Sequence, residues 1–454
     1  MDAQQWRRCV RISIAEGALA AAMGTLLSGV FLTGFAMELG ASRLQIGVLA
    51  ALPSLASVVQ LAGAWLLRRG FNRKRLCLGA VTASRLCWAA VLVIPLAGAG
   101  GSSAAVVALI ALVGVSSLFG SLAGVAWLSW IRDLVPAEER LGFLGFRSQI
   151  NTVLALVLGV AGAGFLDWWN KAQPHTMGGF FCVLAAAIAC GLIAIPVLNR
   201  LQDPGRGAAA VDSSTAVGST RESGANFRRL VAFYMAWNLA CSLAAPFFSV
   251  FMLEKLHLPY WHITALYALQ SLAGLAATGW WTSLGKWMGP RRVVFAATLG
   301  EAFFPLGWMF MGAETTWALP LLFLFGVFQA PLAVGAHTLV MRLAPDERAS
   351  SCLAAFNATM GLVMAGAAVL GGWVSTLVTA QPLVVSGVEI GGLKLVFFLS
   401  FVGRLASLAL LNRVVDAQEA PLKSLATPWG RLGWKVQPRL AEAAEPTAAE
   451  NSVS

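Results

Sequence analysis

Residues 103–131 read SAAVVALIALVGVSSLFGSLAGVAWLSWI and contain no charged side chain. An α-helix rises about 1.5 Å per residue, so about 20 apolar residues cross the hydrocarbon core of a bilayer. This stretch is long enough to do so. The whole chain resembles it, because its 454 residues are 58% hydrophobic and 12% charged, whereas soluble domains carry about 25% charged residues. The composition excludes an ordinary soluble protein and indicates an integral membrane protein.

Stretches of this kind recur along the chain, and many contain Gly or Pro, which membrane helices tolerate. The predicted spans are 12–37, 44–67, 76–99, 103–131, 148–166, 177–197, 230–253, 260–285, 293–313, 317–341, 352–378 and 395–412. We therefore predict an all-α integral membrane fold with twelve transmembrane helices.

The basic residues indicate the orientation of these spans. Alternate connections, together with the termini, hold 26 Lys and Arg residues, whereas the other connections hold only four. Loops rich in Lys and Arg stay in the cytoplasm. The net charge of +11 is thus explained by topology rather than by a nucleic-acid partner. We expect a multi-pass protein of the cell (inner or plasma) membrane with both termini cytoplasmic.

One connection differs from the others. Residues 199–229 are rich in Gly, Ser, Ala and charge, which is typical of a flexible linker. We predict an N-terminal bundle over 1–198, this cytoplasmic linker, a C-terminal bundle over 230–412 and a disordered cytoplasmic tail over 413–454.

The two halves show an internal repeat at an offset of 216 residues. The matching pairs are Phe35 and Phe251, Glu38 and Glu254, Gly63 and Gly279, and Trp65 and Trp281. The connection LVPAEER at 134–140 likewise resembles LAPDER at 343–348. Both connections lie between the fourth and fifth spans of their half, which favours a duplication.

Two six-helix halves, a cytoplasmic linker and basic loops after the second span of each half resemble the major facilitator superfamily, over about residues 10–412. The resemblance implies two pseudo-symmetric six-helix bundles and a gating role for those loops. The matching loop positions are Gly63, Arg68, Gly70 and Arg73 in the first half, and Gly289, Arg291 and Arg292 in the second. Leu67 and Ser283 stand where the family has an acid, so neither copy carries its charge relay.

Four charged residues lie within predicted spans: Glu16, Arg85, Glu301 and Arg404. Charge inside a membrane is costly and marks candidates for function. In the family, helices three, nine and twelve are peripheral, so we expect structural roles for Arg85, Glu301 and Arg404. We expect Glu16 to pair with Arg85 or to carry protons.

For Glu301 we consider a pair with Arg342 or a protonated side chain. His337 is either a packing residue or a proton relay.

Helices one, four, seven and ten usually line the central cavity in the family, with contributions from helices two, five, eight and eleven. Amide, hydroxyl and aromatic side chains there suit a neutral, hydroxyl-rich or amphipathic solute. The candidates for substrate binding are Ser28, Gln60, Ser117, Asn151, Trp237, Asn238, Tyr267, Gln270, Gln329 and Asn357.

The sequence contains no GxxxxGK[ST] motif, no HExxH, no GxSxG and no CxxC pair. We therefore expect no enzyme activity, no cofactor and no metal site. The favoured interpretation is a monomeric secondary transporter that moves a small metabolite or sugar-like solute across the bilayer by alternating access, coupled to protons. Efflux of drugs or lipophiles is the alternative within this class. A non-transporting membrane sensor or scaffold is the alternative outside it.

Overall fold

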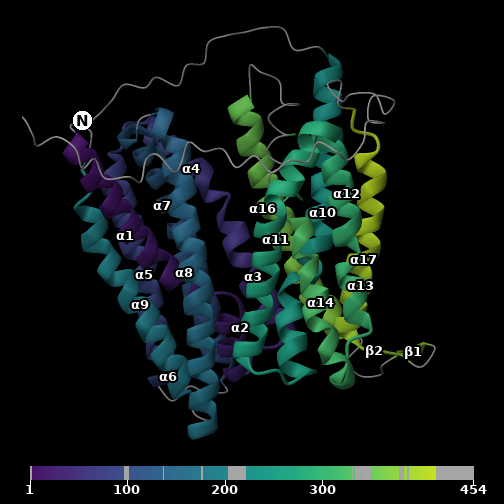
Figure 1. Cartoon of the computed structure of the whole chain (residues 1–454). Helices are drawn as coiled ribbons and strands as arrows, with labels where there is room; N and C mark the ends of the chain where they lie inside the picture. The colour runs from purple at the N-terminus through teal and green to yellow at the C-terminus, as the bar shows by residue number, and fades with distance from the viewer. Residues whose placement is uncertain are drawn as a thin grey trace, which may run out of the picture.

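The computed structural model describes residues 3–96, 102–135, 137–174, 177–202, 221–329, 331–332, 339, 349–377, 383–385 and 388–415. These residues are mainly α-helical, with short 3-10 segments, one small hairpin and short connections between the helices. Figure 1 shows the helices of the first half, in purple and blue, beside those of the second half, in teal to yellow.

The first half contains helices α1 (Ala3–Leu26), α2 (Gly29–Glu38), α3 (Arg43–Ala56), α4 (Val59–Arg68), α5 (Arg73–Val91), α6 (Val93–Leu96), α7 (Ser103–Leu134), α8 (Ala137–Ala172) and α9 (Gly178–Asn199). Leu27 and Ser28 separate α1 from α2, and Gly29, the first residue of α2, has a φ of 56°, which favours glycine. The predicted first span is therefore two helices in series.

The second half contains α10 (Arg221–Glu254), α11 (Tyr260–Met288), α12 (Pro290–Ala302), α13 (Phe304–Met309), η1 (Ala313–Ala318), α14 (Leu319–Phe323), η2 (Leu324–Phe328), α16 (Ala349–Leu377) and α17 (Gly392–Leu411). Strands β1 (Leu383–Val385) and β2 (Val388–Ile390) pair antiparallel before α17. Helix α10 begins at Arg221, so residues 221–229 are helical instead of belonging to the predicted linker.

Eight segments of the described chain are long and apolar enough to cross a membrane: Arg8–Glu38, Arg43–Arg68, Ser103–Arg132, Gly142–Ala172, Gly178–Asn199, Ala225–Glu254, Ala355–Leu377 and Gly392–Leu411. Each coincides with a predicted span. Three further predicted spans fall on α5 with α6, on α11, and on α12 with α13. The remaining predicted span is 317–341, and its described part is formed mainly of η1, α14 and η2. The fold is the predicted all-α membrane architecture.

The buried core differs between the two ends of the molecule. We call the end that carries the N-terminus the linker end and the end that carries β1 and β2 the hairpin end (Figure 1). One apolar cluster contains residues of both halves, among them Phe35 and Phe180 from the first and Phe251 and Phe397 from the second.

At the linker end, the described core residues form separate clusters within each half. Trp130 and Leu198 belong to one cluster, and Phe233 and Leu411 belong to another. The halves are thus packed together toward the hairpin end and divided toward the linker end.

Helices α3 and α16 form a close contact between the halves, which we call the seam. Ala51 of α3 packs with Ala365 and Ala368 of α16. A Cβ atom added to Gly47 would lie 2.5 Å from the backbone oxygen of Ala368. Small residues let helix backbones approach this closely in membrane proteins, so the seam depends on the absence of side chains.

The seam gives the first prediction. The substitution Gly47→Val should destabilise the folded protein by about 1–3 kcal/mol, because overpacking forces the backbones apart. Thermal unfolding in detergent measures this loss. Gly366→Val is the matched control, since a Cβ at Gly366 of α16 meets nothing within 4 Å. Equal melting temperatures for the two variants would contradict the role assigned to the seam.

Candidate functional site

Two cavities lie inside the helix bundle, one in each half. The N-cavity has a volume of about 460 Å³ and is lined mainly by α1, α5 and α7, with contributions from α2, α3, α8 and α9. The C-cavity has a volume of about 330 Å³ and is lined by α10, α11, α12, α13, α17 and the segment around Gln329. Both volumes are in the range of small-molecule sites.

Glu16 holds the charged cluster of the N-cavity together. Its Oε2 accepts from Nη2 of Arg147 at 2.9 Å, and its Oε1 lies 3.9 Å from Nη2 of Arg85. Arg147 also donates through Nε to the backbone oxygen of Ser13 at 3.2 Å, and its guanidinium stacks over Trp127 with 4.3 Å to the ring centroid. The expected Glu16–Arg85 contact is present, and Arg147 is the nearer partner.

Sequence reasoning missed Arg147 because it placed this residue in the connection before the span 148–166. Helix α8 begins at Ala137, so Arg147 lies well inside a helix. The signal was available in the stretch LGFLGFRSQI at 141–150, which has only one charged side chain and no proline. A helix can extend through it without a break.

The C-cavity contains the second charged pair. Nη1 of Arg404 donates to the backbone oxygen of Glu301 at 2.8 Å and to its Oε1 at 3.5 Å. Nε2 of Gln329 donates to the same carboxylate oxygen at 3.5 Å, and the Arg404 guanidinium lies 5.5 Å from the ring centroid of Trp237. The partner of Glu301 is thus Arg404, which the sequence did not indicate. Arg342 lies outside the described residues.

Arg85, Glu301 and Arg404, for which we expect structural roles, each take part in a buried ion pair. All three line a cavity, and each is at most 6% exposed. Long side chains from the third, ninth and twelfth helices reach inward, where a partner of opposite charge offsets part of their desolvation. Arg85 and Glu301 are related by the repeat offset of 216 residues. Each belongs to the ion pair of its own half, but the two residues have opposite charges.

The other predicted residues divide into three groups. Trp237, Tyr267, Gln270 and Gln329 line the C-cavity, and Ser28 and Ser117 line the N-cavity. Gln60, Asn151, Asn238 and Asn357 are not among the lining residues of either cavity. Of these, Gln60 and Asn357 are exposed. Asn238 donates to the backbone oxygen of Tyr234 at 2.8 Å. His337 lies outside the described residues.

The loops after the second span of each half are similar in backbone and contacts. Gly70 and Gly289 have φ values of 90° and 86°, which favour glycine. Lys74 donates to the backbone oxygen of Asn199 at 2.7 Å, and Arg291 donates to that of Asn412 at 3.4 Å. Each loop is therefore fastened to the end of the sixth helix of its own half.

The remaining loop positions predicted for gating lie nearby. Gly63 is buried in α4 against Leu122, Arg68 ends α4, Arg73 begins α5, and Arg292 lies in the first turn of α12.

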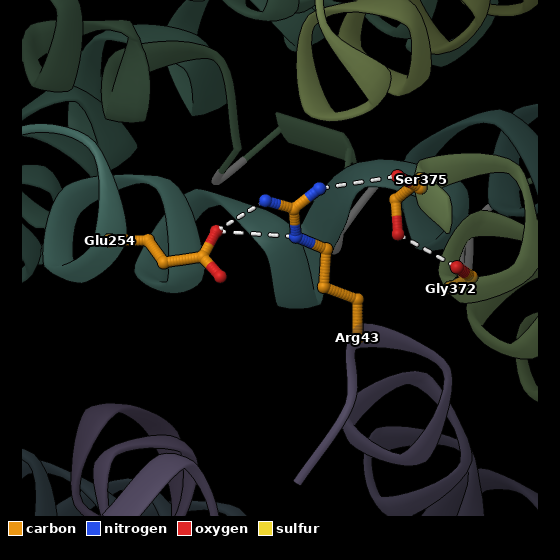
Figure 2. A network of polar contacts seen from close by, with 4 residues as sticks. All are labelled: Arg43, Glu254, Gly372 and Ser375. Carbon is orange, nitrogen blue, oxygen red and sulfur yellow. Dashed lines mark hydrogen bonds and ion pairs between the residues drawn. The ribbon is translucent and has the colours of Figure 1, made fainter. Parts of the chain in front are cut away.

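A polar network joins the halves at the hairpin end. Figure 2 shows Arg43, at the start of α3, between Glu254 at the end of α10 and Ser375 near the end of α16. Nε and Nη2 of Arg43 donate to Oε2 of Glu254 at 3.2 and 2.7 Å, and Nη1 donates to the backbone oxygen of Ser375 at 3.3 Å. The Ser375 hydroxyl donates to Gly372. One arginine thus connects three helices across the seam.

Asp167 of α8 forms a second polar connection between the halves. Its two carboxylate oxygens accept from the backbone N–H groups of Tyr260 and Trp261, at 2.9 and 2.7 Å. These are the first residues of α11, whose N-terminal N–H groups have no partner within the helix. A carboxylate there is favoured by hydrogen bonding and by the helix dipole.

Cavities inside a bundle of membrane-spanning helices, with contacts between its halves concentrated at one end, are the arrangement expected of a membrane transport protein. The family model of the Major Facilitator Superfamily matches residues 15–368, so the chain belongs to this superfamily. A comparison with curated proteins found no match. The family and the neighbouring structures are transporters rather than enzymes.

Several solved structures share the fold at low sequence identity. The nucleoside transporter NupG is 12% identical with a TM-score of 0.62, covering 90% of this chain and 99% of the other. A bacterial homologue of the iron transporter ferroportin in an inward-facing state is 14% identical with a TM-score of 0.65, covering 91% and 99%. A bacterial homologue of the human lysosomal transporter Spinster is 14% identical with a TM-score of 0.64, covering 90% and 97%.

The network around Arg43 gives the second prediction. Partly exposed ion pairs contribute about 1 kcal/mol or less, so Glu254→Gln should raise the population with an open hairpin end by up to about fivefold. Electron–electron distance measurements between spin labels at Lys171 and Lys255, after replacement of the native cysteines, report this opening.

Glu38→Gln is the matched control for that experiment. Glu38 is the repeat equivalent of Glu254, and it is exposed. A longer distance in both variants, or in neither, would contradict the role of the Arg43 network.

Proposed function

We propose that this protein moves a small organic solute across the cell membrane by alternating access. The observation that carries the proposal is the divided core, with one apolar cluster across both halves and separate clusters at the linker end. Such packing suits two bundles, 1–198 and 230–412, that rock about a site between them. Opening one end while closing the other requires the contacts at the hairpin end to break.

The distribution of basic residues supports an orientation for this cycle. The linker end carries the Arg- and Lys-rich loops, so the positive-inside rule assigns it to the cytoplasm, with both termini there. The structure then corresponds to an inward-facing state. In keeping with this, the bacterial ferroportin homologue gives a TM-score of 0.65 in its inward-facing state and 0.54 in its outward-facing state.

The polar contacts at the hairpin end suit a reversible closure. Arg43 and Glu254 have side chains that are 16% and 35% exposed, so water can replace each partner when the pair separates. The aspartate contact to α11 is likewise made to backbone N–H groups at a helix end. Neither contact leaves a deeply buried charge without a partner after opening.

The C-cavity supports a metabolite as substrate. Gln270 and Gln329 offer amide donors and acceptors, and Trp237 and Tyr267 offer aromatic faces. Drug or lipophile efflux remains the alternative, favoured by the additional aromatic wall of Phe248 and Phe304. We expect the protein to act as a monomer within the bilayer.

Glu301 is the residue that we assign to proton coupling. Its side chain lies in the cavity wall with 5% of the residue exposed, and its Oε2 has no hydrogen-bond partner. A protonated Glu301 would weaken the pair with Arg404 and free that guanidinium. Proton binding and the conformation of the C-cavity would then be linked.

The third prediction tests transport itself. Proteoliposomes containing the protein should exchange at least one solute identified by a thermal-shift screen, since a ligand of the folded state raises its stability. A short cleavable cross-link between cysteines at positions 43 and 254 should abolish this flux by holding the hairpin end closed, and cleavage should restore it. Absence of flux for every binding solute, or flux that survives the cross-link, would favour a scaffold or a channel.

The fourth prediction concerns coupling. Glu301→Gln should eliminate solute accumulation driven by a pH gradient while leaving solute exchange without a gradient within about twofold, because the amide cannot bind and release a proton. Radiolabelled uptake with and without the gradient measures both. Glu314→Gln removes an exposed acid of η1 and should change neither. Retained accumulation in Glu301→Gln would assign the coupling elsewhere.

A further inference from the structure

The charges that line the N-cavity do not balance. Glu16 contributes one negative charge, whereas Arg85 and Arg147 contribute two positive charges. Arginine remains protonated in proteins, so the excess of one positive charge cannot be removed by titration. The described lining residues of this cavity include no second acid.

The hydrogen-bond donors of the N-cavity are also in excess. Nη1 of Arg85 and Nε1 of Trp127 are buried and have no hydrogen-bond partner, and both residues line the cavity. Arg85 is only 6% exposed. A buried donor without an acceptor loses the free energy of its missing hydrogen bond, so a ligand that supplies acceptors would stabilise this cavity.

The C-cavity shows that such an excess is not general in this protein. There Glu301 and Arg404 carry one charge of each sign. Their unpaired atoms are one acceptor, Oε2 of Glu301, and one donor, Nε of Arg404. A ligand of the C-cavity therefore needs no net charge to balance the cavity, whereas a ligand of the N-cavity needs a negative charge.

The rest of the N-cavity restricts the kind of anion. Its wall includes Met23, Leu27, Leu32, Val81, Trp88 and Val113. A small inorganic anion would leave these apolar surfaces without contacts. An anion with an apolar body fills them while its charged group meets the arginines.

We propose that the N-cavity binds an organic anion, in which a carboxylate or phosphate ester faces Arg85, Arg147 and Trp127 and an apolar body lies against Leu32, Trp88 and Val113. This inference rests on the proposed function and narrows the small organic solute named there to an organic acid whose charged group lies in the N-cavity. The same acceptor chemistry could come from a soluble acid or from the headgroup of an anionic lipid.

Direct binding to the purified full chain in phosphatidylcholine nanodiscs tests the proposal without requiring transport. The probes are acetate, hexanoate, phenylacetate and benzyl phosphate, titrated by calorimetry, with hexanamide and phenylacetamide as neutral counterparts. We expect at least one of the larger anions to bind about tenfold or more tightly than its neutral counterpart, because hydrogen bonds to charged groups exceed neutral ones by this factor.

Variants expected to change anion affinity in opposite directions distinguish recognition of charge from loss of folding. Arg147→Gln and Arg85→Gln should each weaken anion binding by about tenfold, whereas Glu16→Gln should strengthen it, because the excess charge becomes two. Arg147→Lys keeps the charge and should retain most of the affinity. Arg200→Gln removes an exposed charge at the end of α9 and should have no effect. Thermal unfolding of every variant identifies any that does not fold. The increase in anion affinity expected for Glu16→Gln cannot result from loss of folding, so this variant tests the proposal even if an arginine variant does not fold.

Nanodiscs that contain phosphatidylglycerol identify the source of the anion. If this lipid competes with phenylacetate, or binds with the same variant pattern when no soluble anion does, the occupant is a lipid headgroup and the proposal holds. Equal binding of the acids and amides, binding of acetate alone, or weaker anion binding in Glu16→Gln overturns it. If the protein transports a solute but does not bind these anions, only the inference about the N-cavity is overturned. If it binds the anions but transports no solute, only the proposed function is overturned.

Discussion

The close contact between α3 and α16 determines how the two halves of this protein can lie against each other. Gly47 has no space for a side chain beside the backbone of Ala368, so the helices meet along backbone and alanine surfaces. Membrane helices associate through such packing because lipid supplies no hydrophobic driving force between them. With this contact made at the hairpin end, Arg43 reaches Glu254 and Ser375, and Asp167 reaches the start of α11. The polar contacts therefore depend on the apolar one.

The free-energy cost of burying charge determines which charged side chains lie together inside each half. Each half contains a buried Arg–Glu contact beside its cavity. In the second half, removal of either Glu301 or Arg404 would leave an unpaired charge in a medium of low dielectric constant. The repeat preserves the position on the third helix of each half but reverses the sign, from Arg85 to Glu301. Their partners consequently come from different helices, Glu16 of α1 in one half and Arg404 of α17 in the other. A duplicated fold has thus acquired two cavities of different charge.

The sequence predicted the spans well because length and hydropathy are sufficient for that purpose, as for 103–131 and α7. It predicted the neighbourhood of Glu16 and Arg85 from depth along the helices. It failed for Arg404, Glu301 and Arg147 for two physical reasons. A helix that is apolar on all sides gives no sign of which face is turned inward, so residues of peripheral helices were placed away from the cavities. A basic residue next to the end of an apolar stretch also resembles a loop residue, so Arg147 was assigned to the connection before the span 148–166, although α8 begins ten residues earlier.

The two cavities also bear on how binding and closure can be linked. In the proposed transport cycle, closure of the linker end would expel water from the interior and strengthen the interaction between buried charges. An empty N-cavity would enter that drier state with an unmatched positive charge, which would oppose closure, whereas the balanced pair of Glu301 and Arg404 would not. A ligand that neutralises the excess would remove this opposition, so that the loaded protein closes more readily than the empty one. A ligand shifts a conformational equilibrium only by its differential affinity for the two states, and here the difference would arise from the desolvation of a single charge.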